Sequence, residues 1–158
     1  MDTHDIRFEP ITRHNWEDVL RLEVLPEQRH FVPSPAESLA AAYVKPWDEA
    51  LDPYAIYKDQ QLIGCFYISY TPESSDNYWI GGLLIDHKFQ GRGHGRTVLR
   101  EILQFIPTLH PNCEKINLTV EKDNVVAQRL YGSLGFGDTG KVNKYGETIL
   151  AIPLRRCR

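Results

Sequence analysis

A glycine-rich segment between an apolar run and an amphipathic run is the part of this sequence best suited to chemistry. It reads Gln90-Gly91-Arg92-Gly93-His94-Gly95-Arg96, and it follows the strand-like run Leu83-Leu84-Ile85. Amides in the first turn of a helix have no partner within that helix, and glycines let a backbone approach a ligand closely. The segment therefore predicts an anion site suited to a pyrophosphate, with Arg92 and Arg96 adding charge-assisted contacts.

Two common nucleotide-binding loops fit this segment poorly. A P-loop requires a Lys-Ser or Lys-Thr pair after its last glycine, and the chain has Arg96-Thr97 instead. A dinucleotide fingerprint places a third glycine at position 96, which is Arg96. On this segment alone, a second interpretation stays open: a glycine-rich turn that starts a helix and binds nothing. His94 is expected to contribute only its backbone N–H.

The first half of the chain predicts a strand, two helices and three more strands. A strand is expected over residues 6–9, then a helix over 14–24 that stops at Pro26. Ser34, Pro35 and Glu37 form a capping box that starts a second helix running to about Val44. A hairpin is expected over 54–57 and 62–70, then a strand over 78–85 whose paired glycines, Gly81 and Gly82, indicate a bulge or close backbone approach.

The second half predicts a helix, a strand, a helix and a closing pair of strands. The helix over 93–106 ends at Pro107, and a strand follows over 115–121. Asp123 or Asn124 caps a helix to about residue 134, with a buried stripe of Val126, Leu130 and Leu134. Strands over 136–142 and 147–154 close the chain, so residues 1–158 are expected to form one mixed α/β domain.

Composition narrows the class of protein. Of 158 residues, 42% are apolar and 25% are charged, which is typical of a globular protein. The formal net charge is -3, so no overall positive charge favours binding to nucleic acid or to an anionic membrane. No signal peptide or spanning run is evident, so a cytoplasmic location is expected. Cys65, Cys113 and Cys157 are odd in number and far apart, and the histidines lack ligand spacing, so no metal is expected.

Two motifs in order resemble those of the GCN5-related N-acetyltransferase (GNAT) superfamily. The run from Gln90 to Gly95 is similar to its Gln/Arg-x-x-Gly-x-Gly/Ala signature. Asn124, Ala127, Leu130-Tyr131 and Gly135-Phe136 are similar to its Asn-x-x-Ala-x-x-Leu-Tyr-x-x-x-Gly-Phe pattern. The resemblance implies the GNAT fold of the α/β (α+β) class. This fold has a mixed, mostly antiparallel central sheet of about seven strands with about four helices, splayed between strands 4 and 5.

The same resemblance implies an acyltransferase that passes an acetyl group from acetyl-CoA directly to an amine. Tyr131 would protonate the departing thiolate, although a lone tyrosine on such a helix is more often a core residue. Asn124 would contact the pantetheine arm and can also serve as an N-cap. The expected coenzyme-binding residues are Leu83, Leu84, Ile85, Gln90, Gly91, Arg92, Gly93, His94, Gly95, Arg96 and Asn124.

The acceptor is less clearly marked. Residues 22–32 are similar to a pattern of bacterial spermine/spermidine (diamine) acetyltransferases, which makes a polyamine the leading acceptor ahead of another small amine or a protein amine. Glu23, Glu27, Asp76 and Tyr78 are the expected acceptor-binding residues, with Trp79 a second cation–π face.

The general base is left open by the sequence. Many relatives place a carboxylate on the fourth strand, but the run 78–85 contains none and has glycines there. Glu23, Glu27, Asp76 and Glu121 are the candidates. The missing acid also keeps open a non-catalytic acyl-CoA-binding or sensor domain. From the resemblance alone a homodimer is expected.

Overall fold

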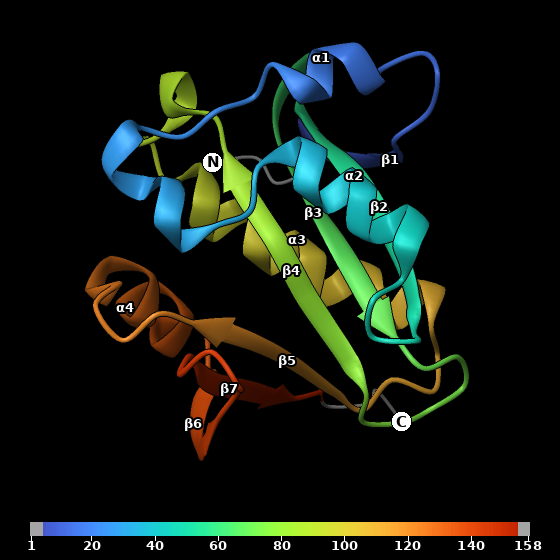
Figure 1. Cartoon of the computed structure of the whole chain (residues 1–158), viewed down its shortest axis with the longest axis vertical. Coiled ribbons are helices and arrows are strands. Elements are labelled where there is room, and N and C mark those ends of the chain that lie inside the picture. Colours follow the sequence, from blue (N-terminus) through green and yellow to red (C-terminus); the bar gives the residue numbers. More distant parts are fainter. Residues whose placement is uncertain (1–4, 155–158) are drawn as a thin grey trace.

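A seven-stranded sheet organises the molecule (Figure 1). The structure is a computed structural model that describes residues 5–154. The strand order is β1-β2-β3-β4-β5-β7-β6, and every pair is antiparallel except β4–β5, which is parallel. The strands are β1 Ile6–Pro10, β2 Ala50–Lys58, β3 Gln61–Tyr70, β4 Tyr78–Ile85, β5 Lys115–Val120, β6 Gly137–Val142 and β7 Thr148–Pro153.

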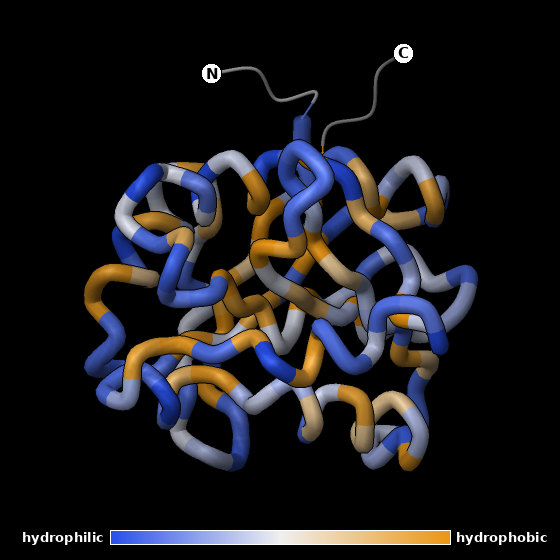
Figure 2. The backbone as a smooth tube through the Cα atoms, turned by 90° about the horizontal axis from the view of Figure 1, so that it is seen from above, coloured by the Kyte–Doolittle hydropathy of each residue, from blue (hydrophilic) through white to orange (hydrophobic). Residues whose placement is uncertain are grey.

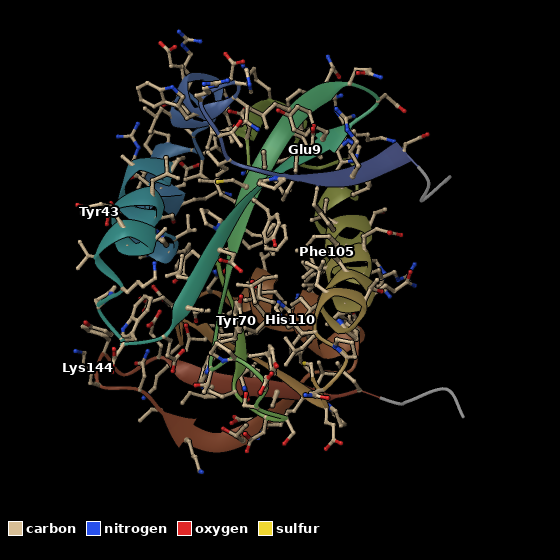
Figure 3. All side chains as sticks on the ribbon, turned by 90° about the vertical axis from the view of Figure 1, so that its right-hand side faces the viewer. Glu9, Tyr43, Tyr70, Phe105, His110 and Lys144 are labelled. Atoms are coloured by element: carbon tan, nitrogen blue, oxygen red, sulfur yellow. The ribbon has the colours of Figure 1, made fainter. Side chains whose placement is uncertain are left out.

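Helices cover both faces of this sheet. Within the described residues they are α1 Trp16–Leu20, α2 Pro35–Val44, α3 His94–Leu109 and α4 Val125–Ser133, with 3-10 helices η2 Pro26–Phe31 and η3 His87–Phe89. Figure 3 shows the two layers edge-on: Tyr43 of α2 lies on one side of the sheet, and Phe105 of α3 lies on the other. Each face of the central strands is therefore covered by a helix.

The sheet divides the apolar core in two. The larger cluster packs α3 against the strands, with Val98, Leu99 and Ile102 fully buried beside Phe66 and Ile80. The smaller cluster packs Val19 of α1 against residues from β2, β3 and β4. Figure 2 shows the hydrophobic stretches crossing the middle of the molecule, with hydrophilic loops around them. The central strands are thus fixed from both sides, and they provide a rigid floor for a site.

Several local predictions are confirmed because their chemistry is local. Glu37 N donates to Ser34 Oγ at 3.2 Å and Ser34 N to Glu37 Oε1 at 3.3 Å, so the capping box starts α2 as expected. The β2–β3 hairpin turns at Asp59 and Gln60, which both have positive φ, as a two-residue hairpin loop requires. β4 has the predicted bounds, and the register of β3 and β4 shifts beside its glycines.

The helix predicted over 14–24 is too long, since α1 ends at Leu20. The reason is a distant residue. Asp86, only 2% exposed at the end of β4, accepts a hydrogen bond from Glu23 N at 3.1 Å, and Glu23 O accepts one from His87 N at 2.9 Å. These bonds hold the chain after α1 against the end of β4, and no helix can form there.

Two further helix predictions are wrong. Pro107 does not end α3, which continues to Leu109 with His110 N donating to Ile106 O at 2.8 Å. Proline lacks an N–H, and here the helix tolerates that single missing bond for one last turn. Val126 is not part of a buried stripe, because its side chain is 81% exposed and lines an open cavity, while Leu130 and Leu134 are half-buried.

Candidate active site

One large cavity, about 1030 Å³, lies where the sheet opens between β4 and β5. The two parallel strands share a single pair of backbone partners, Trp79 and Asn117, and then diverge toward α4 (Figure 1). Asn117 is buried, and its Nδ2 donates to Asp76 O at 3.1 Å and to Tyr78 O at 3.2 Å. The two strands are therefore joined at one end, and past this point their facing edges make no backbone pairing with each other.

The glycine-rich turn forms one end of the cavity. Gly91 and Gly93 both have φ of +78°, a conformation open to glycine, and Gly93 is the N-cap of α3. Gln90 Nε2 donates to Ile85 O at 2.9 Å and so ties the turn to the end of β4. Gly91, Gly93, His94 and Gly95 line the cavity, so the first turn of α3 faces an open space. This arrangement suits an anion.

The side chains of Arg92 and Arg96 take other roles than the predicted phosphate contacts. The Arg92 guanidinium lies 5.9 Å from the centre of the Phe89 ring, and Arg96 donates to Ser133 Oγ at the end of α4. Neither residue is among those that line the cavity. Their backbone amides remain available for an anion, but the contact with Ser133 makes Arg96 a link between α3 and α4.

His94 contributes more than the backbone N–H expected of it. Its side chain is 7% exposed and lines the cavity, and its Nδ1 has no hydrogen-bond partner within residues 5–154. Burial, and then the positive charges of Lys58 and Arg92, lower the pKa of His94. A neutral imidazole therefore stands at the entrance of α3 with one nitrogen buried and unpartnered among the described residues.

The bulge in β4 has a steric cause. Gly82 has φ of +57°, and a Cβ on it would lie 2.7 Å from Ser38 Oγ on α2. A Cβ on Gly81 would overlap the ring of Tyr67, its partner on β3. The glycines thus admit neighbouring side chains close to the β4 backbone. Leu83, Leu84 and Ile85 beyond them line the cavity, where the edge of β4 has no pairing with β5.

Asn124 and Tyr131 both face the cavity from α4. Asn124 is the N-cap, and its Oδ1 accepts a hydrogen bond from Ala127 N at 3.3 Å. Tyr131 is half-buried, with its ring centre 6.0 Å from that of Phe136. Burial raises the pKa of Tyr131, so its hydroxyl keeps its proton at neutral pH. A proton donor therefore stands in the cavity on the α4 side.

Two carboxylates that sequence reasoning missed also line the cavity. Glu49 precedes β2, and its Oε1 accepts a hydrogen bond from Asn77 Nδ2 at 2.9 Å; Asn77 Oδ1 in turn accepts one from Trp79 Nε1 at 2.7 Å. Glu147 precedes β7, and its Oε1 accepts a bond from Asn143 Nδ2 at 2.7 Å. Both carboxylates line the cavity and are half-buried. Their charge suits a cation.

The predicted acceptor-binding residues do not gather here. Glu23 is exposed and lies 3.8 Å from His87 Nε2, while Glu27 and Asp76 are exposed, and none of the three lines the cavity. Tyr78 is 1% exposed and packs on the α3 side, its ring centre 5.7 Å from that of Tyr70. Glu121 also lies outside the lining. Of the aromatic candidates, Trp79 lines the cavity as expected.

The missed residues had a partial signal in the sequence. When one strand has a large aromatic residue and the next strand has a pair of glycines, the aromatic ring can lie directly on the glycine backbone. Tyr67 and Gly81 have this arrangement. Glu49 and Glu147 gave no such signal, because they come from distant segments and meet only through the fold.

A sheet opened between two parallel strands, with a glycine-rich helix entrance and a half-buried tyrosine around the opening, defines an acyltransferase of the N-acetyltransferase fold. The chain matches the model of the Acetyltransferase (GNAT) family over residues 16–136, and it belongs to this family. The resemblance found in the sequence, the predicted fold and the class of enzyme, an acetyltransferase, are thereby confirmed.

Two kinds of relative accompany the family match. The spermine/spermidine N(1)-acetyltransferase of Bacillus subtilis (strain 168) is 28% identical over 158 residues, covering 94% of this chain and 99% of that protein. The spermidine N-acetyltransferase of Vibrio cholerae, solved with CoA and spermine, superposes with a TM-score of 0.72 at 19% identity, covering 95% of this chain and 96% of that one. AAC(6')-Ib, solved with ribostamycin and coenzyme A, has a TM-score of 0.75 at 17% identity, with 94% and 93% covered.

Residues 5–154 contain no group of three or more His, Cys, Asp or Glu side chains placed to hold a metal ion. No helix in the same range has the length and apolar character needed to cross a membrane. Cys157 lies outside the described residues, while Cys65 and Cys113 are free and buried.

Proposed function

We propose that this acetyltransferase moves an acetyl group from acetyl-CoA to a primary amine of a polyamine. The observation that carries the proposal is one cavity that is lined both by the first turn of α3 and by two carboxylates. Backbone amides at the entrance of α3 suit a pyrophosphate, and the part of the cavity lined by Glu49 and Glu147, the acceptor end, suits ammonium groups. The free edge of β4 lines the same cavity.

The coenzyme would lie along the first part of this cavity. Its pyrophosphate would bind the backbone of residues 92–96, including the His94 N–H, with Gln90 and Gly91 forming the turn. Its pantetheine arm would pair with the exposed backbone edge at Leu83, Leu84 and Ile85, as an added strand would. Asn124 would contact the arm from α4.

Tyr131 would act as the acid for the departing thiolate. In direct transfer the amine nitrogen bonds to the acetyl carbon and the C–S bond breaks. The thiolate takes the Tyr131 proton, and the proton that the nitrogen loses returns to Tyr131 through solvent. A raised pKa supports this role because it keeps the hydroxyl protonated until the thiolate forms. Holding the two reactants in one cavity supplies much of the acceleration.

A polyamine acceptor is supported by two independent observations. Relatives that cover nearly the whole chain include a spermine/spermidine N(1)-acetyltransferase. The acceptor end itself has two carboxylates from separate elements and aromatic side chains, Trp47 and Trp79, that can face a cation. An acceptor with several ammonium groups and an apolar carbon chain matches both features.

Self-association forms part of this proposal. A spermidine N-acetyltransferase of Vibrio cholerae described as dodecameric superposes on this chain with a TM-score of 0.68. We expect an oligomer of two or more copies in solution. Light scattering coupled to size exclusion tests this expectation, and a mass equal to one chain at micromolar concentration contradicts it.

An amine panel tests the proposed reaction. Release of CoA from acetyl-CoA is followed with spermidine, spermine, propylamine, a lysine peptide and an aminoglycoside as acceptors. We expect spermidine and spermine to have kcat/KM values at least about tenfold above the others, a difference of about 1.4 kcal/mol. Preference for the lysine peptide or the aminoglycoside would replace the polyamine. Acetyl-CoA binding without CoA release on any amine would refute the proposed reaction.

A further inference from the structure

The ring of Tyr67 lies directly over the bulge of β4. β3 pairs Tyr67 with Gly81, and a Cβ on Gly81 would overlap the ring atoms of Tyr67. A Cβ on Gly82 would lie 2.9 Å from Tyr67 Cδ2. The ring therefore fills the space above both glycines. A carboxylate on β4 at position 81 could not share that space with it.

The hydroxyl of Tyr67 has no assigned role within the protein. Tyr67 lines the cavity, and the described residues offer its hydroxyl no hydrogen bond. Tyr70, on the same strand, differs, since its hydroxyl donates to Asp52 Oδ2 at 2.7 Å. The Tyr67 ring is also held in place, because it stacks on Trp47 with ring centres 6.3 Å apart and planes 27° apart. A fixed ring thus presents an unused polar group to the cavity.

Glu147 lines the same cavity as Tyr67 and supplies negative charge there. Burial, and then the charge of Glu147, raise the pKa of Tyr67, so the phenol is neutral at neutral pH. Glu147 is held by the turn that precedes β7, because its backbone N donates to Asn143 Oδ1 at 3.0 Å. Lys144, labelled in Figure 3, is a cation on the same turn. Its Nζ lies 5.1 Å from the centre of the Tyr145 ring.

We propose that Tyr67 and Glu147 together seat the acceptor nitrogen over the β4 bulge. The phenol oxygen accepts a hydrogen bond from the nitrogen, and the carboxylate offsets its charge while it is an ammonium group. This inference rests on the proposed acetyl transfer and assigns the reacting amine its place. Tyr67 thereby occupies the position over β4 where a carboxylate at residue 81 would otherwise stand.

The test uses the full chain and four variants with matched chemistry. Tyr67→Phe keeps the ring over the glycines and removes only the hydroxyl, and Glu147→Gln removes only the charge. We expect each to lower kcat/KM for spermidine about 10- to 100-fold, as for a lost hydrogen bond to a charged group. The KM for acetyl-CoA should stay within about twofold, because neither residue lies at the α3 entrance. Tyr43→Phe and Glu17→Gln, both on exposed helix positions, should match the wild type.

The double variant and a binding measurement decide the outcome. If both residues hold one nitrogen, Tyr67→Phe combined with Glu147→Gln loses little more than the worse single variant. Losses that multiply in full, or a Tyr67→Phe enzyme as active as the wild type, overturn the inference. If the wild type acetylates no amine, the proposed function fails, and calorimetry of spermidine binding then judges the subsite. Equal affinity in wild type and Tyr67→Phe, or no binding to either, overturns it.

Discussion

Tyr67 and Gly81 face each other across the β3–β4 pair so closely that position 81 has no room for a side chain. This contact explains why the fourth strand contains a glycine at the place where a carboxylate is common among related enzymes. The Tyr67 ring, from the neighbouring strand, fills the space that a side chain at position 81 would need. The polar group at this point of the cavity therefore comes from β3.

Substitution of Gly81 by Ala should destabilise the protein. The new Cβ would displace the Tyr67 ring, and overpacking of this kind costs about 1–3 kcal/mol. Tyr67→Ala in the same chain should return part of that loss, because it removes the clash. Urea unfolding of the two single variants and the double variant measures the coupling. Gly137→Ala is the matched control, since a Cβ there meets nothing within 4 Å. Equal stability of Gly81→Ala and Gly137→Ala would contradict the contact.

Replacement of Tyr131 by Phe should lower kcat about 10²- to 10⁴-fold, the usual contribution of a positioned acid. Affinity for acetyl-CoA should change little, because the ring remains on α4. Stopped assays for kcat and calorimetry for coenzyme binding separate the two effects. Tyr43→Phe serves as the control, as Tyr43 is 90% exposed on α2. Unchanged turnover would remove Tyr131 as the acid.

The raised pKa of Tyr131 also sets an expectation for pH. A general acid works only while protonated, so activity is lost as pH rises through the folded-state pKa. That value lies above the ordinary tyrosine pKa of about 10. From pH about 7 to about 9.5, kcat/KM should rise as the amine loses its proton, without a falling limb. A fall inside this range would show that another group is the acid.

Glu49 should discriminate between acceptors with one and with several amino groups. Glu49 precedes β2 and Glu147 precedes β7, so the two carboxylates come from separate elements, and the charge of Glu49 can serve a second ammonium group. Glu49→Gln is expected to raise KM for spermidine about tenfold, as for one lost charge-assisted hydrogen bond, and to leave propylamine unaffected. Steady-state kinetics on both amines, with Glu17→Gln as control, checks this. An equal change for the two amines would mean that Glu49 supports the fold alone.

His110 should make stability depend on pH. It lies against the rings of Tyr70 and Tyr78, with ring centres 4.4 Å and 5.4 Å away, and its Nε2 has no partner within residues 5–154. Burial lowers its pKa, although the charge of Asp52 opposes this. Because the unfolded chain binds the proton more tightly, stability is full above the unfolded pKa of about 6.5 and falls below it.

His110→Gln should flatten that dependence. Urea unfolding at pH about 7.5 and about 5.5 gives the loss of free energy for each protein, and the loss should be smaller in the variant. His94, whose pKa is also lowered, accounts for part of what remains. An equal loss in both proteins would show that His110 is not the group that titrates.

The sequence predicted best what neighbouring residues decide. Ser34 and Glu37 cap α2 within one turn, and the glycines at 91 and 93 adopt positive φ inside their own loop, so local pattern was sufficient for both. The order of strands and helices followed from the same kind of evidence. Family motifs then supplied the opening of the sheet, which no periodicity reveals.

The failures came from contacts between distant segments. α1 ends early because Asp86, at the far end of β4, binds the backbone of Glu23. The acceptor end could not be predicted because Tyr67, Glu49 and Glu147 come from a strand and two loops that only the fold brings together. Acidic residues near the expected loop were the natural candidates, yet Glu27 and Asp76 point into solvent.

The single pairing of Trp79 with Asn117 has a consequence for solubility. Unpaired strand edges invite strands of other molecules and so promote aggregation. Here the unpaired edges of β4 and β5 face each other across the cavity. Asn117 joins the two strands at one end of this opening, and α4 lies beside it. The backbone hydrogen-bonding groups of β4 are thereby accessible to a small ligand but not to a strand of another molecule.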